Sequence, residues 1–365
     1  MMKNSVKIAA IVAALAVVAG GVGYDVLTSS APATPCASAP PSSTYQTVAV
    51  AHPSPSTGAP GNRPLSGAEA RDPGGLPRAS PGSLTDPTAV IQVVAAENFW
   101  GSLVSQLGGN QTSVLSIVTN PNTDPHEYEA NSSDAIAIAD AQLVIVNGVG
   151  YDDWALQLIG AANNPDQIVL NVGDLNGVSV NGGIVSGNPH MWYNPPYVNR
   201  TVAAMFSDLV ALRPAAASLF GTNYGTLNAS LGALYGTGSQ IRERFAGTEV
   251  ASTESIFVYL ANYTDLDLVS PPAFMQAVAE GYDPPAQSVV EFQCQLESGH
   301  VAVLVYNVQT VTPITSQMQA LAAAHNVTVV GISETVQPPD ALFQDWMGAE
   351  YVALENALAA QAVGH

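Results

Sequence analysis

Two histidines and two glutamates in this sequence have the chemistry to bind a divalent transition metal. Imidazole nitrogens and carboxylate oxygens both coordinate such ions, and carboxylates favour harder ions than cysteine thiolates do. Each of the four residues lies at or beyond the end of an apolar stretch that we predict to be a buried strand. The four are His126 in DPHEYE, His190 in NPHMWYNP, Glu254 in ESIFVYLANY and Glu334 in GISETVQPP.

Each candidate also has an ordinary explanation that needs no metal. His126 could be a solvated loop histidine, and His190 could fill space in a loop stiffened by two Asn-Pro pairs. Glu254 could stabilise a helix N-terminus through the helix dipole, and Glu334 could be an exposed loop acid. The sequence spacing alone therefore does not establish a metal site.

The surrounding elements read as strands alternating with amphipathic helices. This alternation predicts an α/β fold with two lobes, each a mostly parallel sheet flanked by helices. In open sheets of this kind, ligands bind outside the carboxyl ends of the strands, where the four candidates stand. The predicted strands cover residues 89–95, 114–118, 143–146, 168–172, 250–252, 301–306 and 327–332.

One long helix is predicted between the lobes, over residues 213–245. Leucines recur there every three or four residues, and Pro214 suits a first helical turn. Five glycines oppose this prediction, because each costs about 1 kcal/mol relative to alanine in a helix. The helix would connect an N-terminal lobe of residues 89–212 with a C-terminal lobe of residues 246–365.

The first 28 residues predict export from the cytoplasm. Two lysines precede an apolar run over residues 8–22, which is the pattern of a secretory signal. The run is slightly long for a signal, so an uncleaved N-terminal anchor is the alternative. Residues 29–88 are rich in Pro, Ser, Gly and Ala without apolar periodicity, which predicts an extended linker.

The chain has two cysteines, Cys36 and Cys294. Cys36 follows the apolar run at the distance of a lipid-attachment cysteine, although Thr34 and Pro35 depart from the usual small residues there. A disulfide between the two cysteines is compatible with an oxidising compartment. Because tying a flexible linker to the core is no obvious gain, we expect two free or separately used thiols.

The charge balance excludes one large class of partners. The formal net charge is -20, from 9 Lys and Arg against 29 Asp and Glu, and no lysine follows Lys7. Attraction to nucleic acid or to an anionic membrane surface needs basic clusters. We therefore expect no nucleic-acid binding and membrane contact only through the N-terminal segment. We also expect a monomer.

The four motifs together resemble the metal-binding solute-binding proteins of bacterial zinc/manganese ABC importers, over roughly residues 90–362. The resemblance implies that His126 and His190 are imidazole ligands of the N-terminal lobe. Glu254 stands where the family carries histidine, commonly in zinc importers, or glutamate, commonly in manganese importers. Glu334 stands where the family usually has aspartate, so this position departs from the pattern.

The resemblance implies a binding protein and not an enzyme. Its cargo would be a divalent ion, with Mn favoured by the two carboxylates and by a 173–188 loop without histidine, and with Zn or Fe as alternatives. Zinc outbinds manganese at most nitrogen and oxygen sites, which works against this choice. The implied partners are an ABC permease and its ATPase. The alternatives are a metal-dependent hydrolase and a metal-binding surface adhesin.

A histidine ligand normally donates its other ring N–H to a fixed acceptor. Four residues near the two histidines in sequence could accept it, and the sequence does not choose among them: Asp124, Glu127, Glu129 and Asn194. Trp192 is expected to pack in the core beside the His190 loop. His300 and His325 are expected to be structural or exposed.

Overall fold

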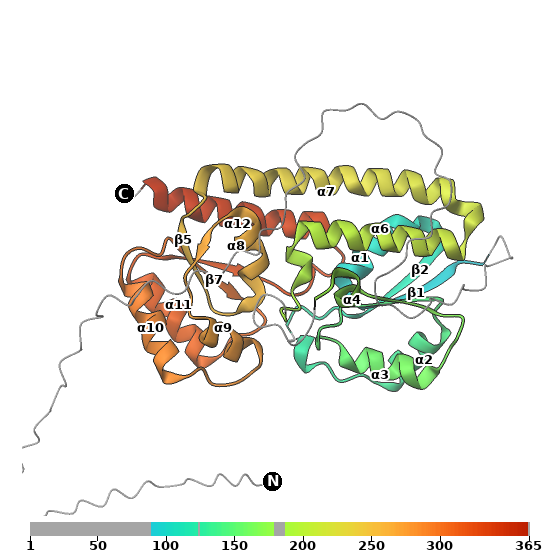
Figure 1. Cartoon of the computed structure of the whole chain (residues 1–365), viewed down its shortest axis with the longest axis horizontal. Helices are drawn as coiled ribbons and strands as arrows, with labels where there is room; N and C mark the ends of the chain where they lie inside the picture. The colour runs from blue at the N-terminus through green and yellow to red at the C-terminus, as the bar shows by residue number, and fades with distance from the viewer. Residues whose placement is uncertain (1–88, 123–124, 179–186, 364–365) are drawn as a thin grey trace, which may run out of the picture. The chain divides into compact units, whose positions relative to one another are not determined.

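The computed structural model describes residues 89–122, 125–178 and 187–363 (Figure 1). The predictions of an N-terminal signal or anchor, a linker and a role for Cys36 lie outside the described residues. Cys294, half-buried on α10 (Ala286–Glu297), is disulfide-bonded. The expectation of a free thiol at Cys294 is therefore wrong, and a disulfide there is what an oxidising compartment permits.

The N-terminal sheet has four parallel strands in the order β2-β1-β3-β4. Successive side chains of its strand β1 point alternately into two apolar cores. Val93 and Ala95 face the main core, whereas Val94 and Ala96 face a second core that also contains Ile138 of α2. A strand buried on both faces reads as a continuous apolar run. The strands are β1 (Ile91–Glu97), β2 (Thr112–Val118), β3 (Leu143–Val146) and β4 (Ile168–Asn171).

The C-terminal sheet repeats this topology, with parallel strands in the order β6-β5-β7-β8. The predicted α/β fold with two lobes is thus confirmed. The two lobes share one strand order, although the sequence shows no internal repeat. Strand β6 has two residues, too few for a period-two pattern, and the sequence did not predict it. The strands are β5 (Glu249–Ser252), β6 (Asp267–Leu268), β7 (Val303–Asn307) and β8 (Thr328–Ile332).

Helices cover both sheets. In Figure 1, α2 and α3 lie below the N-terminal sheet, with α1 and α6 above it. The C-terminal sheet is covered in part by α9, α10 and α11. The helices of the first lobe are α1 (Asn98–Gly108), α2 (Ser132–Asp140), α3 (Asp153–Ala162), α4 (Val172–Asn176) and α6 (Pro195–Leu212). Those of the second are α8 (Val258–Thr264), α9 (Pro272–Ala279), α10, α11 (Pro313–Ala324) and α12 (Phe343–Val363).

The long connecting helix is present as α7 (Ala217–Phe245). It begins four residues later than predicted, because Pro214–Ala216 form a 3-10 turn before it. Four of its five glycines, at 221, 225, 232 and 236, face open space, where a side chain would meet nothing. Gly238 instead packs against the rings of Tyr263 and Tyr351, so a larger residue would clash there.

The two lobes are bound together by more than the connecting helix. Helix α12 runs beside α7 in Figure 1 and also packs on β8 and α1. The side chain of Asn98 donates to the Val336 carbonyl (3.2 Å) and accepts from the Val336 amide (3.0 Å). The main apolar core extends through both lobes, and its members include Trp100, Leu231 and Val305. A shared core of this kind resists large hinge motion.

No single helix among the described residues is long and apolar enough to cross a bilayer. One helix pair, Pro195–Leu212 with Pro214–Phe245, meets the criterion by length and composition, and it is bent by 119°.

Candidate metal site

The four candidate residues all lie beyond carboxyl ends of strands, from four different segments. His126 is in a 3-10 turn (Pro125–Glu127) after β2, and Glu334 follows β8. His190 precedes the turn Met191–Tyr193, and Glu254 precedes the turn Ser255–Phe257. Parallel strands bring such ends to one edge of each sheet, and the two edges face each other across the lobes.

Three of the four candidates converge closely. His126, His190 and Glu334 each offer one ligand atom, and these atoms all lie within 4.8 Å of one another. The Oε2 atom of Glu334 is 3.6 Å from Nε2 of His126 and 3.9 Å from Nε2 of His190. Ligands about 2.1 Å from a tetrahedral ion are about 3.4 Å apart, so a small contraction would close this set around one ion.

Glu254 stands slightly further from the centre than Glu334. Its Oε1 atom is 4.0 Å from Nε2 of His190. The side chains of His190, Glu254 and Glu334 are 0–1% exposed, whereas that of His126 is 24% exposed. Three ligand candidates are thus buried, and His126 reaches solvent.

The protonation of His190 suits a metal ligand. Its Nδ1 lies 2.7 Å from Oδ1 of Asn188, which also accepts the His190 backbone N–H at 2.9 Å. Because Asn188 Oδ1 can only accept, the network places the ring proton on Nδ1. Nε2 is buried without a hydrogen bond and carries the lone pair. Burial, aided by neighbouring His126, lowers the pKa of His190 well below its ordinary value, which keeps the ring neutral.

Asn188 ties this histidine to the other lobe. Its Nδ2 donates to the Ser255 carbonyl at 2.7 Å, and its own carbonyl accepts from the Tyr259 hydroxyl at 3.0 Å. Asn188 was not among the four acceptors considered from the sequence. The available signal was its spacing two residues before His190, from which an Asn side chain reaches the backbone N–H two positions on.

Asn307, the last residue of β7, holds the two carboxylates. Its Nδ2 donates to Glu254 Oε1 at 3.0 Å and also donates to Glu334 Oε1. A neutral donor between two buried carboxylates offsets their mutual repulsion without adding charge. Tyr151 of the other lobe donates to Glu334 Oε2 at 2.6 Å. Neither residue was singled out in the sequence.

The backbone beneath Glu334 is also fixed. The side-chain oxygen of Gln309 accepts the N–H groups of Glu334 (2.8 Å) and Thr335 (3.0 Å). Buried Glu350 accepts the N–H of Ser333 at 2.9 Å. Burial raises the pKa of Glu350 to about 7. The loop that carries the fourth ligand candidate is thus held at three consecutive residues.

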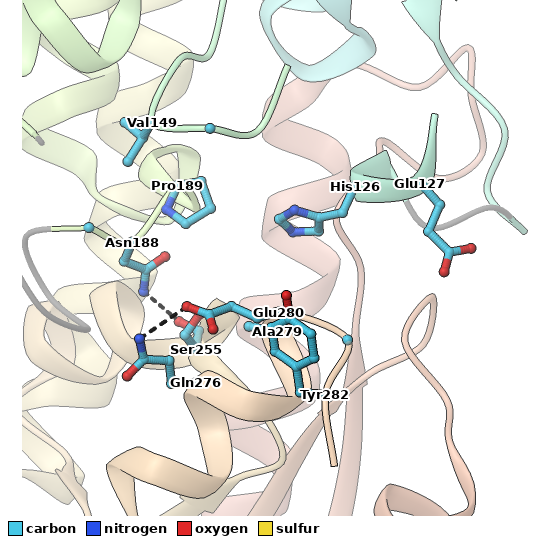
Figure 2. A pocket seen from close by; sticks show the side chains of 13 residues that line it. His126, Glu127, Val149, Asn188, Pro189, Ser255, Gln276, Ala279, Glu280 and Tyr282 are labelled. Carbon is cyan, nitrogen blue, oxygen red and sulfur yellow. Dashed lines mark hydrogen bonds between the residues drawn. The ribbon is translucent and has the colours of Figure 1, made fainter. Parts of the chain in front are cut away.

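A cavity of about 530 Å³ opens beside His126 (Figure 2). Its wall combines residues of both lobes, including Glu127 and Val149 from the first and Gln276, Glu280 and Tyr282 from the second. Glu280 accepts from Gln276 at 3.0 Å. The acidic side chains and the net charge of -20 make this opening attractive to cations.

The structure also places the aromatic and histidine residues that the sequence analysis kept apart from the ligands. Trp192 is 1% exposed and stacks on Phe99, with ring centroids 4.1 Å apart, and its ring meets His190 edge-on. It therefore packs as core beside the loop. His300 and His325 are exposed.

Replacement of Asn307 by alanine tests its role between the carboxylates. We expect Asn307→Ala to weaken metal binding by about 10- to 100-fold, the usual cost of losing a residue that orients metal ligands. Competitive titration against a chelator gives the affinity. Asn228→Ala on α7, a half-exposed position far along the chain from the site residues, is the control. Equal affinities for the two variants would contradict this role.

Comparison with known proteins assigns the chain to a family. Residues 93–357, well over half of the chain, match the family model described as zinc-uptake complex component A, periplasmic (ZnuA). The chain belongs to the ZnuA family. Members of this family are metal-binding components of importers, as the resemblance of the motifs implied.

Individual relatives are distant. The chain is 28% identical over 134 residues to the manganese-binding lipoprotein MntA of Halalkalibacterium halodurans, over 36% of this chain and 43% of that protein. It spans about half the length of the curated relatives it matches. The sequence match to individual relatives is thus partial.

Solved structures are similar over nearly their whole length. The solute-binding protein FpvC of Pseudomonas aeruginosa, solved with Mn²⁺, has a TM-score of 0.60 and 20% identity, over 75% of this chain and 99% of that one. The periplasmic zinc-binding protein TroA of Treponema pallidum has a TM-score of 0.61 and 14% identity, over 75% and 99%. At these identities the likeness establishes the two-lobed fold.

Proposed function

We propose that this chain captures a divalent transition metal outside the cytoplasm and delivers it to an ABC import permease with its ATPase. The proposed ligands are His126, His190, Glu254 and Glu334. The observation that carries the proposal is the convergence of His126 and Glu334 on His190, whose Nε2 is buried without a hydrogen bond. Burying such an atom without a partner is costly unless a ligand completes it.

The proposed cargo is Mn²⁺, with Zn²⁺ and Fe²⁺ as the competing ions. Two carboxylates and two imidazoles form a harder donor set than the histidine-rich or cysteine-containing sites that suit zinc. The relatives whose descriptions name a metal support more than one ion, because they include manganese-binding and iron-binding proteins. Capture is favoured over hydrolysis because the matched family model describes an uptake component. A capture site can also fill its coordination shell with protein, here with four ligands whose carboxylates can bind through both oxygens, whereas a catalytic site keeps a position open for an activated water.

The proposed location is the extracytoplasmic side of the membrane, with the N-terminal segment as the tether and the protein as a monomer. A lipid on Cys36 would occupy the sulfur that a disulfide needs, so the two modifications are mutually exclusive at that residue. Mass spectrometry of the non-reduced chain separates them.

Metal analysis of the purified full chain tests the proposal. After chelation and dialysis, the chain is expected to bind one equivalent of Mn²⁺ or Zn²⁺ with micromolar affinity or better, measured by competitive titration. Comparing the two ions under the same conditions gives the preference. Failure to bind either ion at one equivalent would exclude the proposed function.

A further inference from the structure

Two buried carboxyl groups contact each other behind the site. Glu97 is the last residue of β1 and is 1% exposed, and Asp152, immediately before α3, is 0% exposed. Their side chains are hydrogen-bonded to each other. Two buried carboxyl groups that share a hydrogen bond cannot both be ionised, so one of them carries the shared proton.

The surroundings identify the proton donor. Asp152 accepts the backbone N–H groups of Asn147 at 2.6 Å and Gly148 at 2.8 Å. Such bonds stabilise its ionised form and offset part of the burial that raises its pKa to about 6. Burial and the neighbouring Asp152 raise the pKa of Glu97 well above its ordinary value. Because the two backbone N–H bonds favour the ionised form of Asp152, Glu97 is the acid that donates and Asp152 is the carboxylate that accepts.

Asp152 does not use its carboxylate to cap the helix that it precedes. It turns back onto the end of β3 and holds the turn that follows that strand. This turn has three successive residues with positive φ: Gly148 at 74°, Val149 at 58° and Gly150 at 79°. Val149 is β-branched, a residue type that rarely adopts this conformation. The turn needs a fixed anchor at its start, and the two N–H bonds to Asp152 supply one.

Two hydrogen bonds connect this turn to the segments that carry the proposed metal ligands. Asn147 donates its Nδ2 to the carbonyl of Pro189, the neighbour of His190, at 2.9 Å. Tyr151, next to Asp152 in the chain, donates its hydroxyl to Glu334. Trp100 donates to Oδ1 of Asn147 at 3.2 Å and fixes the orientation of its amide. The acid pair is thus connected to ligands of both lobes.

We infer that Glu97 and Asp152 are positioning residues: a carboxylic acid bonded to a carboxylate that fixes the 147–151 turn and, through it, His190 and Glu334. The inference rests on the proposed function, because it concerns the same ligands. It adds a specific chemical requirement at position 97. That residue must donate a hydrogen bond, and a charge there is not needed.

Substitutions at the two positions separate this requirement from simple packing. Glu97→Gln keeps the volume and an N–H donor, so its metal affinity is expected to stay within about threefold of wild type. Glu97→Leu removes the donor and is expected to lose about 10- to 100-fold, the usual range for residues that orient metal ligands. Asp152→Asn replaces one of the two acceptor oxygens by a donor and is expected to lose as much. Asp153→Asn, an exposed neighbour on α3, is the control.

Affinities are measured by competitive Mn²⁺ titration of the full chain, with circular dichroism to confirm that each variant is folded. Tyr151→Phe is combined with Asp152→Asn, because residues acting through one network give non-additive losses. Wild-type affinity in Asp152→Asn, or equal affinities in Glu97→Gln and a folded Glu97→Leu, would overturn the inference. If Glu97→Leu does not fold, the affinities of Asp152→Asn, Tyr151→Phe and the double variant test the inference instead. Additive losses of affinity in the double variant would then contradict it. A wild-type chain that binds no metal instead refutes the proposed function.

Discussion

His190→Ala is expected to lower metal affinity by more than about 100-fold while leaving the fold intact. Replacing a residue that merely orients a ligand costs about 10- to 100-fold, and His190 is a proposed ligand. Its Nε2 lies 3.9 Å from Glu334 and 4.0 Å from Glu254, central to the set. Its loop remains pinned by the Asn188 bonds to Ser255 and Tyr259, which do not involve the ring.

Competitive titration measures this loss, and circular dichroism reports whether the variant is folded. His325→Ala, an exposed histidine after α11, is the matched control. If a folded His190→Ala bound metal as tightly as the control, His190 would be a core histidine with no ligand role.

Glu334→Gln is expected to weaken metal binding more than Glu254→Gln does. Both changes keep side-chain volume and remove one negative charge. Glu334 Oε2 lies within 3.9 Å of Nε2 of both imidazoles, whereas Glu254 Oε1 lies 4.0 Å from Nε2 of His190. The Glu334 loop stays fixed by Gln309 in this variant, since those bonds involve backbone N–H groups. The difference therefore reports on coordination.

Parallel titrations of the two glutamine variants with Mn²⁺ and with Zn²⁺ measure the difference. The loss in Glu334→Gln is expected to exceed about tenfold for either ion, since the site then has one anionic ligand fewer. A larger loss in Glu254→Gln, or none in Glu334→Gln, would remove Glu334 from the ligand set.

The sequence predicted the elements that lie on strong local patterns. The seven predicted strands all occur, with ends shifted by up to two residues, because a continuous apolar run marks a buried strand but not its boundaries. The shift at β1 matters: the strand ends at Glu97, two residues beyond the prediction, and so buries an acid there. The long helix was visible through its leucine spacing despite its glycines.

The contacts that complete the site could not be predicted from one sequence. Tyr151 and Glu334 are 183 residues apart, and Asn307 and Glu254 are 53 apart. Such pairings depend on how the two lobes are packed, and no local pattern encodes that. The packing of α12 on α1 and β8 escaped prediction for the same reason.

The exposure of His126 sets an order of events for the cargo. It is the one proposed ligand with a solvent-accessible side chain, at the wall of the cavity. Under the proposed function, a hydrated ion arriving there would exchange its first water for His126 and shed the others as it reaches the buried donors. Departure would reverse this sequence, which would make His126 the last protein contact before release. A subtle movement of its short turn would then change the rate of unloading without any separation of the lobes.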